Sequence, residues 1–71
     1  MRISDFTRRE IEMFHRECNF TDTERAMFDL KAKDRTNVQI AMELSVSEST
    51  VSITMRRVRT KIMKVLDWGV Q

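Results

Sequence analysis

Residues 36–62, TNVQIAMELSVSESTVSITMRRVRTKI, predict two amphipathic helices joined by a very short turn. Thr36 stands three residues before Gln39, which is the spacing of a capping box that opens a helix. The apolar side chains that follow recur at helical spacing and form a narrow stripe: Ile40, Ala41 and Leu44. We therefore expect a short helix over about 36–44.

The second helix starts at Ser47, a favourable N-cap residue, and Val46 and Val51 are spaced for a hydrophobic staple across that cap. From there the apolar residues again share one face: Val51, Met55, Val58, Ile62 and Val65. Only a few residues separate the two helices, so we expect them to cross at a large angle. This is the geometry of a helix-turn-helix.

The remaining faces of the second helix carry small hydroxyl groups first and cations later. From Ser52 to Lys64 there are five basic residues and no acidic one: Arg56, Arg57, Arg59, Lys61 and Lys64. A DNA-recognition helix reads base edges with its N-terminal half and meets phosphates with basic side chains. The pattern favours DNA binding over its alternative, a charged helix face that is simply solvated.

Composition indicates a small helical protein with an uneven charge. The chain has 71 residues with one glycine, no proline and no tyrosine, which favours a single all-helical domain with a limited core. Residues 1–30 hold five basic and seven acidic side chains, whereas residues 31–71 hold eight basic and four acidic ones. The net charge of +2 thus divides into −2 and +4, as expected when one part of a protein meets phosphate.

Two further helices are predicted upstream. Thr7 with Glu10, and Thr21 with Glu24, have the spacing of capping boxes. The second of these helices is apolar over a wide arc, so we place it between the first helix and the helix-turn-helix, with Phe28 facing the first helix. The predicted fold is all-α, an N-terminal helix plus a tri-helical helix-turn-helix in one domain over residues 1–71, with helices at about 7–18, 21–33, 36–44 and 47–66.

The sequence argues against an enzyme. His15 and Cys18 are the only imidazole and thiol, and no further soft ligand completes a zinc site. There is no Gly-rich phosphate loop, and we expect no metal, no cofactor and no small-molecule ligand. The lone cysteine, the lack of a signal-peptide pattern and the lack of an apolar run near the ~20 residues that span a bilayer predict a cytoplasmic protein without membrane contact.

The pairs Phe20-Thr21, Ile40-Ala41, Thr50-Val51 and Lys61-Ile62 recur at fixed spacing relative to the predicted helices. On these residues, the stretch 20–62 resembles the LuxR/GerE helix-turn-helix and the similar fourth region of bacterial sigma factors, with no insertion or deletion. Asp34 and Ser45 replace two glycines of that pattern, and we expect the fold to survive because both residue types are accommodated in turns. The family's regulatory domain is missing, so the chain looks like a stand-alone small regulator of the kind carried by phages and mobile elements. The matching residues are Phe20, Thr21, Glu24, Met27, Leu30, Ile40, Ala41, Leu44, Ser47, Thr50, Val51, Val58, Lys61 and Ile62.

The resemblance implies that the helix from Ser47 enters the major groove of double-stranded DNA. The residues then nearest the bases are Ser49, Thr50, Ser52, Ile53 and Arg56. Candidate phosphate contacts are Thr36, Asn37, Arg57, Lys61, Lys31 and Lys33. We expect Arg56→Ala to relax base preference and Lys61→Ala to weaken binding to all sequences alike.

Two groups of apolar residues suggest protein contacts. Val38 and Met42 share the outer side of the helix over 36–44, which suggests a contact with RNA polymerase or another protein, although exposed apolar pairs are common. The late turns of the last helix suggest a homodimer interface, while Trp68 can also fold back on the core. The residues of that predicted interface are Ile62, Met63, Val65, Leu66 and Trp68.

Three functions remain open on the sequence. The favoured one is a homodimeric, sequence-specific DNA-binding transcriptional regulator. The second is a factor similar to sigma region 4 that docks on RNA polymerase at a promoter element. The third is a protein-binding helix-turn-helix module or inhibitor without base recognition.

Overall fold

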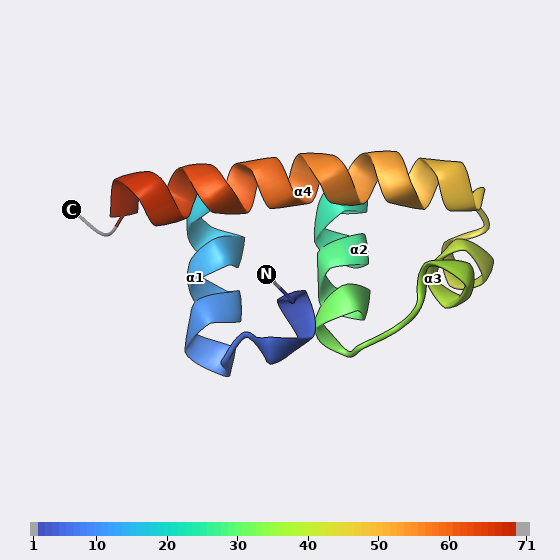
Figure 1. Cartoon of the computed structure of the whole chain (residues 1–71), viewed down its shortest axis with the longest axis horizontal. Helices are drawn as coiled ribbons and strands as arrows, with labels where there is room; N and C mark the ends of the chain where they lie inside the picture. Colours follow the sequence, from blue (N-terminus) through green and yellow to red (C-terminus); the bar gives the residue numbers. More distant parts are fainter. Residues whose placement is uncertain (1, 70–71) are drawn as a thin grey trace.

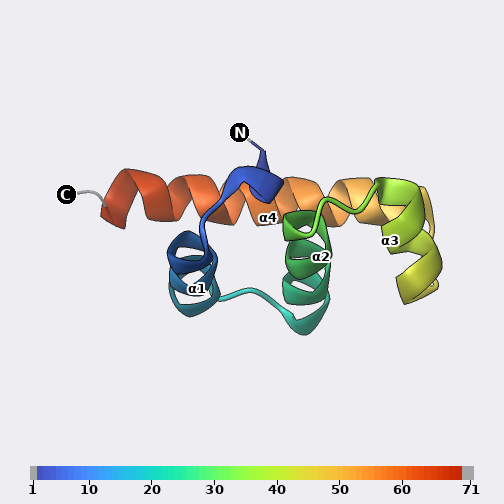
Figure 2. The same ribbon diagram turned by 90° about the horizontal axis from the view of Figure 1, so that it is seen from below.

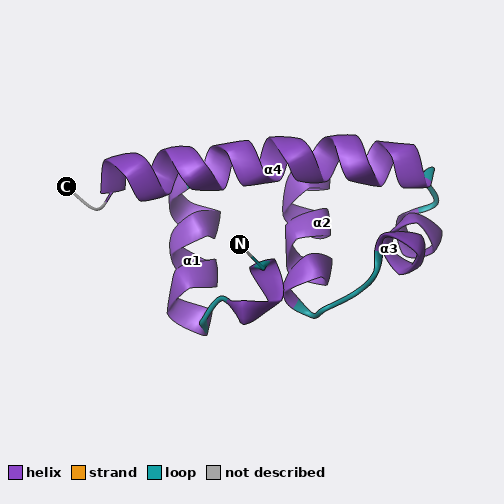
Figure 3. Cartoon of the chain, viewed as in Figure 1, coloured by secondary structure: helices purple, strands orange, loops and turns teal. Residues whose placement is uncertain are grey.

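The computed structural model describes residues 2–69 and the side chains of residues 2–67. It consists of helices joined by short loops, and no strand occurs within the described range (Figures 1 and 3). A short 3-10 helix, η1 (Ile3–Asp5), precedes the four α-helices. These are α1 (Arg8–Glu17), α2 (Asp22–Ala32), α3 (Asn37–Leu44) and α4 (Glu48–Gly69).

The starts of the α-helices follow the polar signals in the sequence. Capping boxes form at Thr7, Thr21 and Thr36, where each threonine hydroxyl accepts from the backbone of the third helical residue and that residue's side chain accepts in return. Ser47 caps α4, since its Oγ accepts from the Thr50 backbone N at 3.1 Å. All four predicted caps are therefore confirmed.

Helix α4 is the longest helix, and the other helices pack along one side of it. Figures 1 and 2 show α1 and α2 standing steeply against α4, with α3 beside the end at which α4 begins. Helix α2 lies between α1 and α3, as the sequence predicted. The molecule measures 38 × 19 × 19 Å, so its long axis follows α4.

One apolar core joins the helices. The rings of Phe14 and Phe28 meet edge-on at 6.2 Å, which confirms the predicted contact between α2 and the first helix. The apolar face of α4 is buried as expected, and Val65 packs against the core while half-buried. The buried apolar residues are Ile3, Phe14, Cys18, Met27, Phe28, Ile40, Ala41, Val51, Met55, Val58 and Ile62.

Three non-glycine residues adopt left-handed backbone conformations at loops. Asp34 has φ 63° and Ser45 has φ 56°, at the two positions where the sequence departs from the glycines of the pattern it resembles. Asn19 does the same at φ 53° in the α1–α2 loop. In the turn between α3 and α4, the Val46 N–H donates to the Ala41 carbonyl at 3.0 Å. The fold thus accommodates Asp34 and Ser45 in place of the two glycines, as predicted, although the left-handed conformation strains the backbone at both residues.

Two features of the termini differ from the prediction. The 3-10 helix was not anticipated, although it places Ile3 in the core at 3% exposure. Helix α4 continues beyond the predicted end at about residue 66 and reaches Gly69. Helix α1 packs against one side of these later turns. Of the helices described, none combines the length and apolar character needed to cross a bilayer.

Candidate nucleic-acid interface

The first turns of α4 present a continuous exposed surface. The hydroxyls of Ser47 and Thr50 lie 2.9 Å apart, so the Thr50 side chain is partly engaged at the helix start. Ile53 is 48% exposed. All the predicted base-contact side chains are exposed: Ser49, Thr50, Ser52, Ile53 and Arg56.

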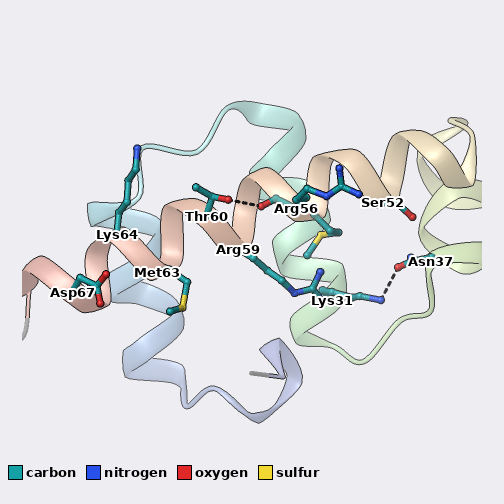
Figure 4. Close-up of a pocket in the computed structure, with 10 residues that line it drawn as sticks. Lys31, Asn37, Ser52, Arg56, Arg59, Thr60, Met63, Lys64 and Asp67 are labelled. Carbon is teal, nitrogen blue, oxygen red and sulfur yellow. Dashed lines mark hydrogen bonds between the residues drawn. The ribbon is translucent and has the colours of Figure 1, made fainter.

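A basic groove of about 600 Å³ runs along one side of this helix, between α4, the end of α2 and the start of α3. Figure 4 shows Lys31 and Asn37 at one end of it and Asp67 at the other, with Arg56 and Arg59 between them. Ser52 and Arg56 belong both to this groove and to the predicted base-contact surface. The groove therefore extends the predicted base-contact surface toward α2.

Lys31 is half-buried in this groove and held by two acceptors. Its ammonium donates to Asn37 Oδ1 at 2.7 Å and to the Arg35 carbonyl at 3.4 Å. Burial lowers the pKa of Lys31, the nearby charge of Arg59 lowers it further, and Asp34 opposes the shift. Asn37, another predicted phosphate contact, is thus positioned by Lys31 at the start of α3.

The other predicted phosphate contacts divide into two groups. Thr36, Arg57 and Lys33 are exposed, and Thr36 Oγ1 accepts from the Gln39 backbone N at 3.2 Å. Lys61 differs, because its ammonium donates to Glu24 Oε1 at 2.5 Å and to the Asn19 carbonyl at 3.1 Å.

Lys61, predicted as a phosphate contact, is thus engaged within the fold. Its partner Glu24 has only 7% of its side chain exposed and also belongs to the capping box of α2. Burial alone would raise the pKa of Glu24, but the hydrogen bonds from Lys61 and Thr21 and the charge of Lys61 together lower it. The pair locks the start of α2 to the middle of α4, on the side away from the basic groove.

The residues predicted to contact other proteins differ in how far they are exposed. Val38 is 49% exposed and Met42 77% exposed on α3, so both are available to a partner. In the predicted dimer interface, Met63 is 48% exposed, whereas Ile62 is fully buried. Because Ile62 is fully buried within the single chain, its side chain is not available to an interface. Val65 and Leu66 are half-buried against the core, and the side chain of Trp68 lies outside the described part.

Arg59 and Lys64 are basic residues of the groove that sequence reasoning did not assign to a site, and Arg59 is the one beside Lys31. It stood among the basic residues of the last helix, and its position seven residues after Ser52 placed it on the same helix side. What the sequence lacked was the position of Lys31, which the packing of α2 brings to the same groove.

The titratable side chains of His15 and Cys18 lie outside this surface and contact other residues of the fold. His15 Nε2 lies 2.5 Å from Asp29 Oδ1, and its ring packs edge-on against Phe28 at 5.5 Å. Cys18 is buried, and burial raises the pKa of its thiol to about 11, with Lys61 opposing and Glu17 adding to the shift. Within residues 2–67, no group of three or more His, Cys, Asp or Glu side chains is placed to hold a metal ion.

The sequence matches a known protein family. Residues 18–66 match the model of the family described as bacterial regulatory proteins, luxR family, and this range covers α2, α3 and most of α4. No curated protein and no solved structure matches the chain. The matched range contains the helix-turn-helix and the whole of the exposed recognition surface described above.

Proposed function

Because the chain belongs to the luxR family of bacterial regulatory proteins, DNA-binding regulators of transcription, we propose that it reads a specific sequence with α4 in the major groove. Such a protein acts on the DNA of the bacterial cytoplasm. The finer assignments below rest on which side chains are exposed, on which elements they stand, and on their chemistry.

The observation that carries the proposal is the exposed N-terminal half of α4. Ser49 and Ser52 can donate to or accept from base edges, and Ile53 can pack on a thymine methyl group. Arg56 can donate two hydrogen bonds to the O6 and N7 acceptors of guanine. These four side chains are exposed together on a helix that is held rigidly by its buried face, from Val51 onward.

Phosphate contacts flank this surface at the start of α3 and on the outer side of α4. The N-terminus of α3 favours an anion through its backbone N–H groups, and Thr36 and Asn37 lie there. Arg57 and Lys33 supply exposed positive charge. These contacts set affinity and its dependence on salt rather than sequence preference.

We propose that the protein acts as a homodimer on a two-part site. A dimer of helix-turn-helix units places two recognition helices in successive major grooves, so its target is a palindrome. Met63, which is 48% exposed in the later turns of α4, supports such a contact beside the half-buried Leu66. The contact surface is narrower than the sequence suggested, because Ile62 is buried.

The test is selection of bound duplexes from a random library at about 0.15 M salt, where exposed charges are already screened. An enriched palindrome supports the homodimer, and its half-site spacing measures the distance between recognition helices. A single unrepeated motif supports sequence recognition by one copy and contradicts the dimer. No enriched motif contradicts base recognition and leaves a protein-binding module as the better description.

The exposure of Val38 and Met42 favours a second candidate, a factor that docks on RNA polymerase as sigma region 4 does. Met42 is 77% exposed, so most of its apolar surface is left unburied in the single chain. The double variant Val38→Ser, Met42→Ser should then keep its affinity for a duplex but lose its effect on transcription by purified polymerase. Glu43→Ser, an exposed position next to Met42 on α3, serves as the control for a change on the same helix. An unchanged effect on transcription from the double variant contradicts docking through α3.

A further inference from the structure

A cluster of positive side chains converges beside α4 from separate parts of the chain. Lys31 at the end of α2 and Arg59 in α4 both line the basic groove. The same two residues also line a second hollow of about 210 Å³, on the side of η1. Arg2 and Arg35 line that second hollow, so four cations from four segments surround it.

Little negative charge balances this cluster. Asp34 is the acidic residue that lines the second hollow, and it lies 3.9 Å from Arg2 at a highly exposed position. Among the described side chains, no carboxylate comes within 4.0 Å of the charged nitrogens of Lys31 or Arg59. The two central cations are therefore paired with neutral oxygens or with solvent.

The fold holds Lys31 and Arg59 close together despite their repulsion. Figure 4 shows the two side chains next to one another over the same opening. The ammonium of Lys31 is fixed by Asn37 and the Arg35 carbonyl, which use two of its three protons. Its pKa is lowered by burial and by Arg59, so the arrangement costs free energy unless an anion is present.

We propose that Lys31 and Arg59 together bind one phosphate group between α2 and α4. A phosphate oxygen can accept from the remaining proton of Lys31, and the Arg59 guanidinium can donate two parallel hydrogen bonds to the same group. Binding removes the repulsion between the two cations.

The DNA backbone is the favoured source of this phosphate, and this part of the inference rests on the proposed function. Arg59 follows Arg56 by three residues, which is about 4.5 Å along a helix at ~1.5 Å per residue. A phosphate at Arg59 is therefore close to a base edge at Arg56. A free polyphosphate offers the same chemistry and is tested separately.

The first experiment measures how salt weakens binding to a random-sequence duplex, so it does not depend on base recognition. The double variant Lys31→Gln, Arg59→Gln should lower the slope of log K against log salt by about 0.9, the value for one phosphate. Between 0.05 and 0.2 M salt the wild type then loses about 3.5-fold more affinity than the variant. Circular dichroism should show that the variant is folded.

The matched control is Arg8→Gln, Arg9→Gln, which removes two exposed charges from the start of α1, outside both hollows. Its slope should equal that of the wild type. An equal drop in both double variants would mean a general charge effect and would overturn the assignment. If the wild type selects no sequence but the Lys31→Gln, Arg59→Gln variant still shows the predicted lower salt slope, only the proposed function is contradicted.

The second experiment titrates inorganic tripolyphosphate into the labelled protein and follows the Arg59 and Lys31 side-chain signals by NMR. Shifts at both residues in the wild type, together with loss of the Arg59 shift in Lys31→Gln, support the phosphate site. If they occur while the duplex slope is unchanged by the double variant, the source is a free polyphosphate. An unchanged slope together with no tripolyphosphate shifts overturns the proposal.

Discussion

Replacing Lys61 with methionine should destabilise the fold without changing how salt affects DNA binding. The ammonium is 2.5 Å from the Glu24 carboxylate, and the two side chains are 32% and 7% exposed. Removing one partner of a fully buried pair costs about 3–5 kcal/mol, whereas exposed pairs contribute up to about 1 kcal/mol. For this half-covered pair we expect a loss of about 2 kcal/mol, or a Tm lower by roughly 8–16 °C.

Thermal unfolding followed by circular dichroism at pH 7 measures the loss, and the salt slope of duplex binding measures the phosphate role. Lys64→Met is the control, because Lys64 is exposed one turn later in α4 and its loss should leave the Tm nearly unchanged. An unaltered Tm with a slope lower by about 0.9 in Lys61→Met would refute the reasoning and restore Lys61 as a phosphate contact.

The same pair gives a pH dependence with a definite sign. Glu24 has a folded-state pKa below its ordinary value of 4.5, so its ion pair stabilises the protein above that pH. The contribution is lost as the pH falls below 4.5 and through the lower folded-state pKa. The stability difference between wild type and Lys61→Met should therefore shrink as the pH is lowered through this range. A difference that stays constant down to pH 2 would contradict a charged Glu24.

Three other predictions concern separate residues. Ser45→Gly should raise the free energy of unfolding by about 0.5–1 kcal/mol, because relief of the left-handed strain exceeds the entropy cost of glycine. Chemical unfolding measures this gain. The control Ser45→Ala keeps Cβ and should show no gain. Cys18 should react with a thiol reagent about 100-fold more slowly than a thiol of pKa 9.0 at pH 8, and equal rates in native protein and in urea would contradict its burial. Arg56→Ala should cost about 1–3 kcal/mol of discrimination at one base position, seen as a relaxed motif in repeated duplex selection. Equal weakening on every sequence would remove Arg56 from base reading.

The sequence determined the helices and their starting points, because the interactions that begin a helix are local. A threonine and the glutamate or glutamine three residues later make a capping box whatever the rest of the chain does, and all three such boxes form. The spacing of Val51, Met55 and Val58 fixed the buried face of α4 for the same reason.

The sequence also determined which face of α4 is free to meet DNA. Once the apolar face is buried, Ser49, Ser52 and Arg56 must point outward, and they are exposed. Their position relative to α3 follows from the short turn at Ser45, a residue type that was expected to be accommodated in a turn.

Tertiary structure alone decided the roles of the basic residues on the sides of α4. Lys61 and Arg59 are two residues apart and look equivalent in the sequence, yet one meets the carboxylate of Glu24 and the other meets Lys31. Those neighbours come from opposite ends of α2, 37 residues before Lys61 and 28 before Arg59. The role of a charged side chain depends on which residues pack beside it, and these can be far away in the sequence. Helical periodicity gives only the direction in which the side chain points.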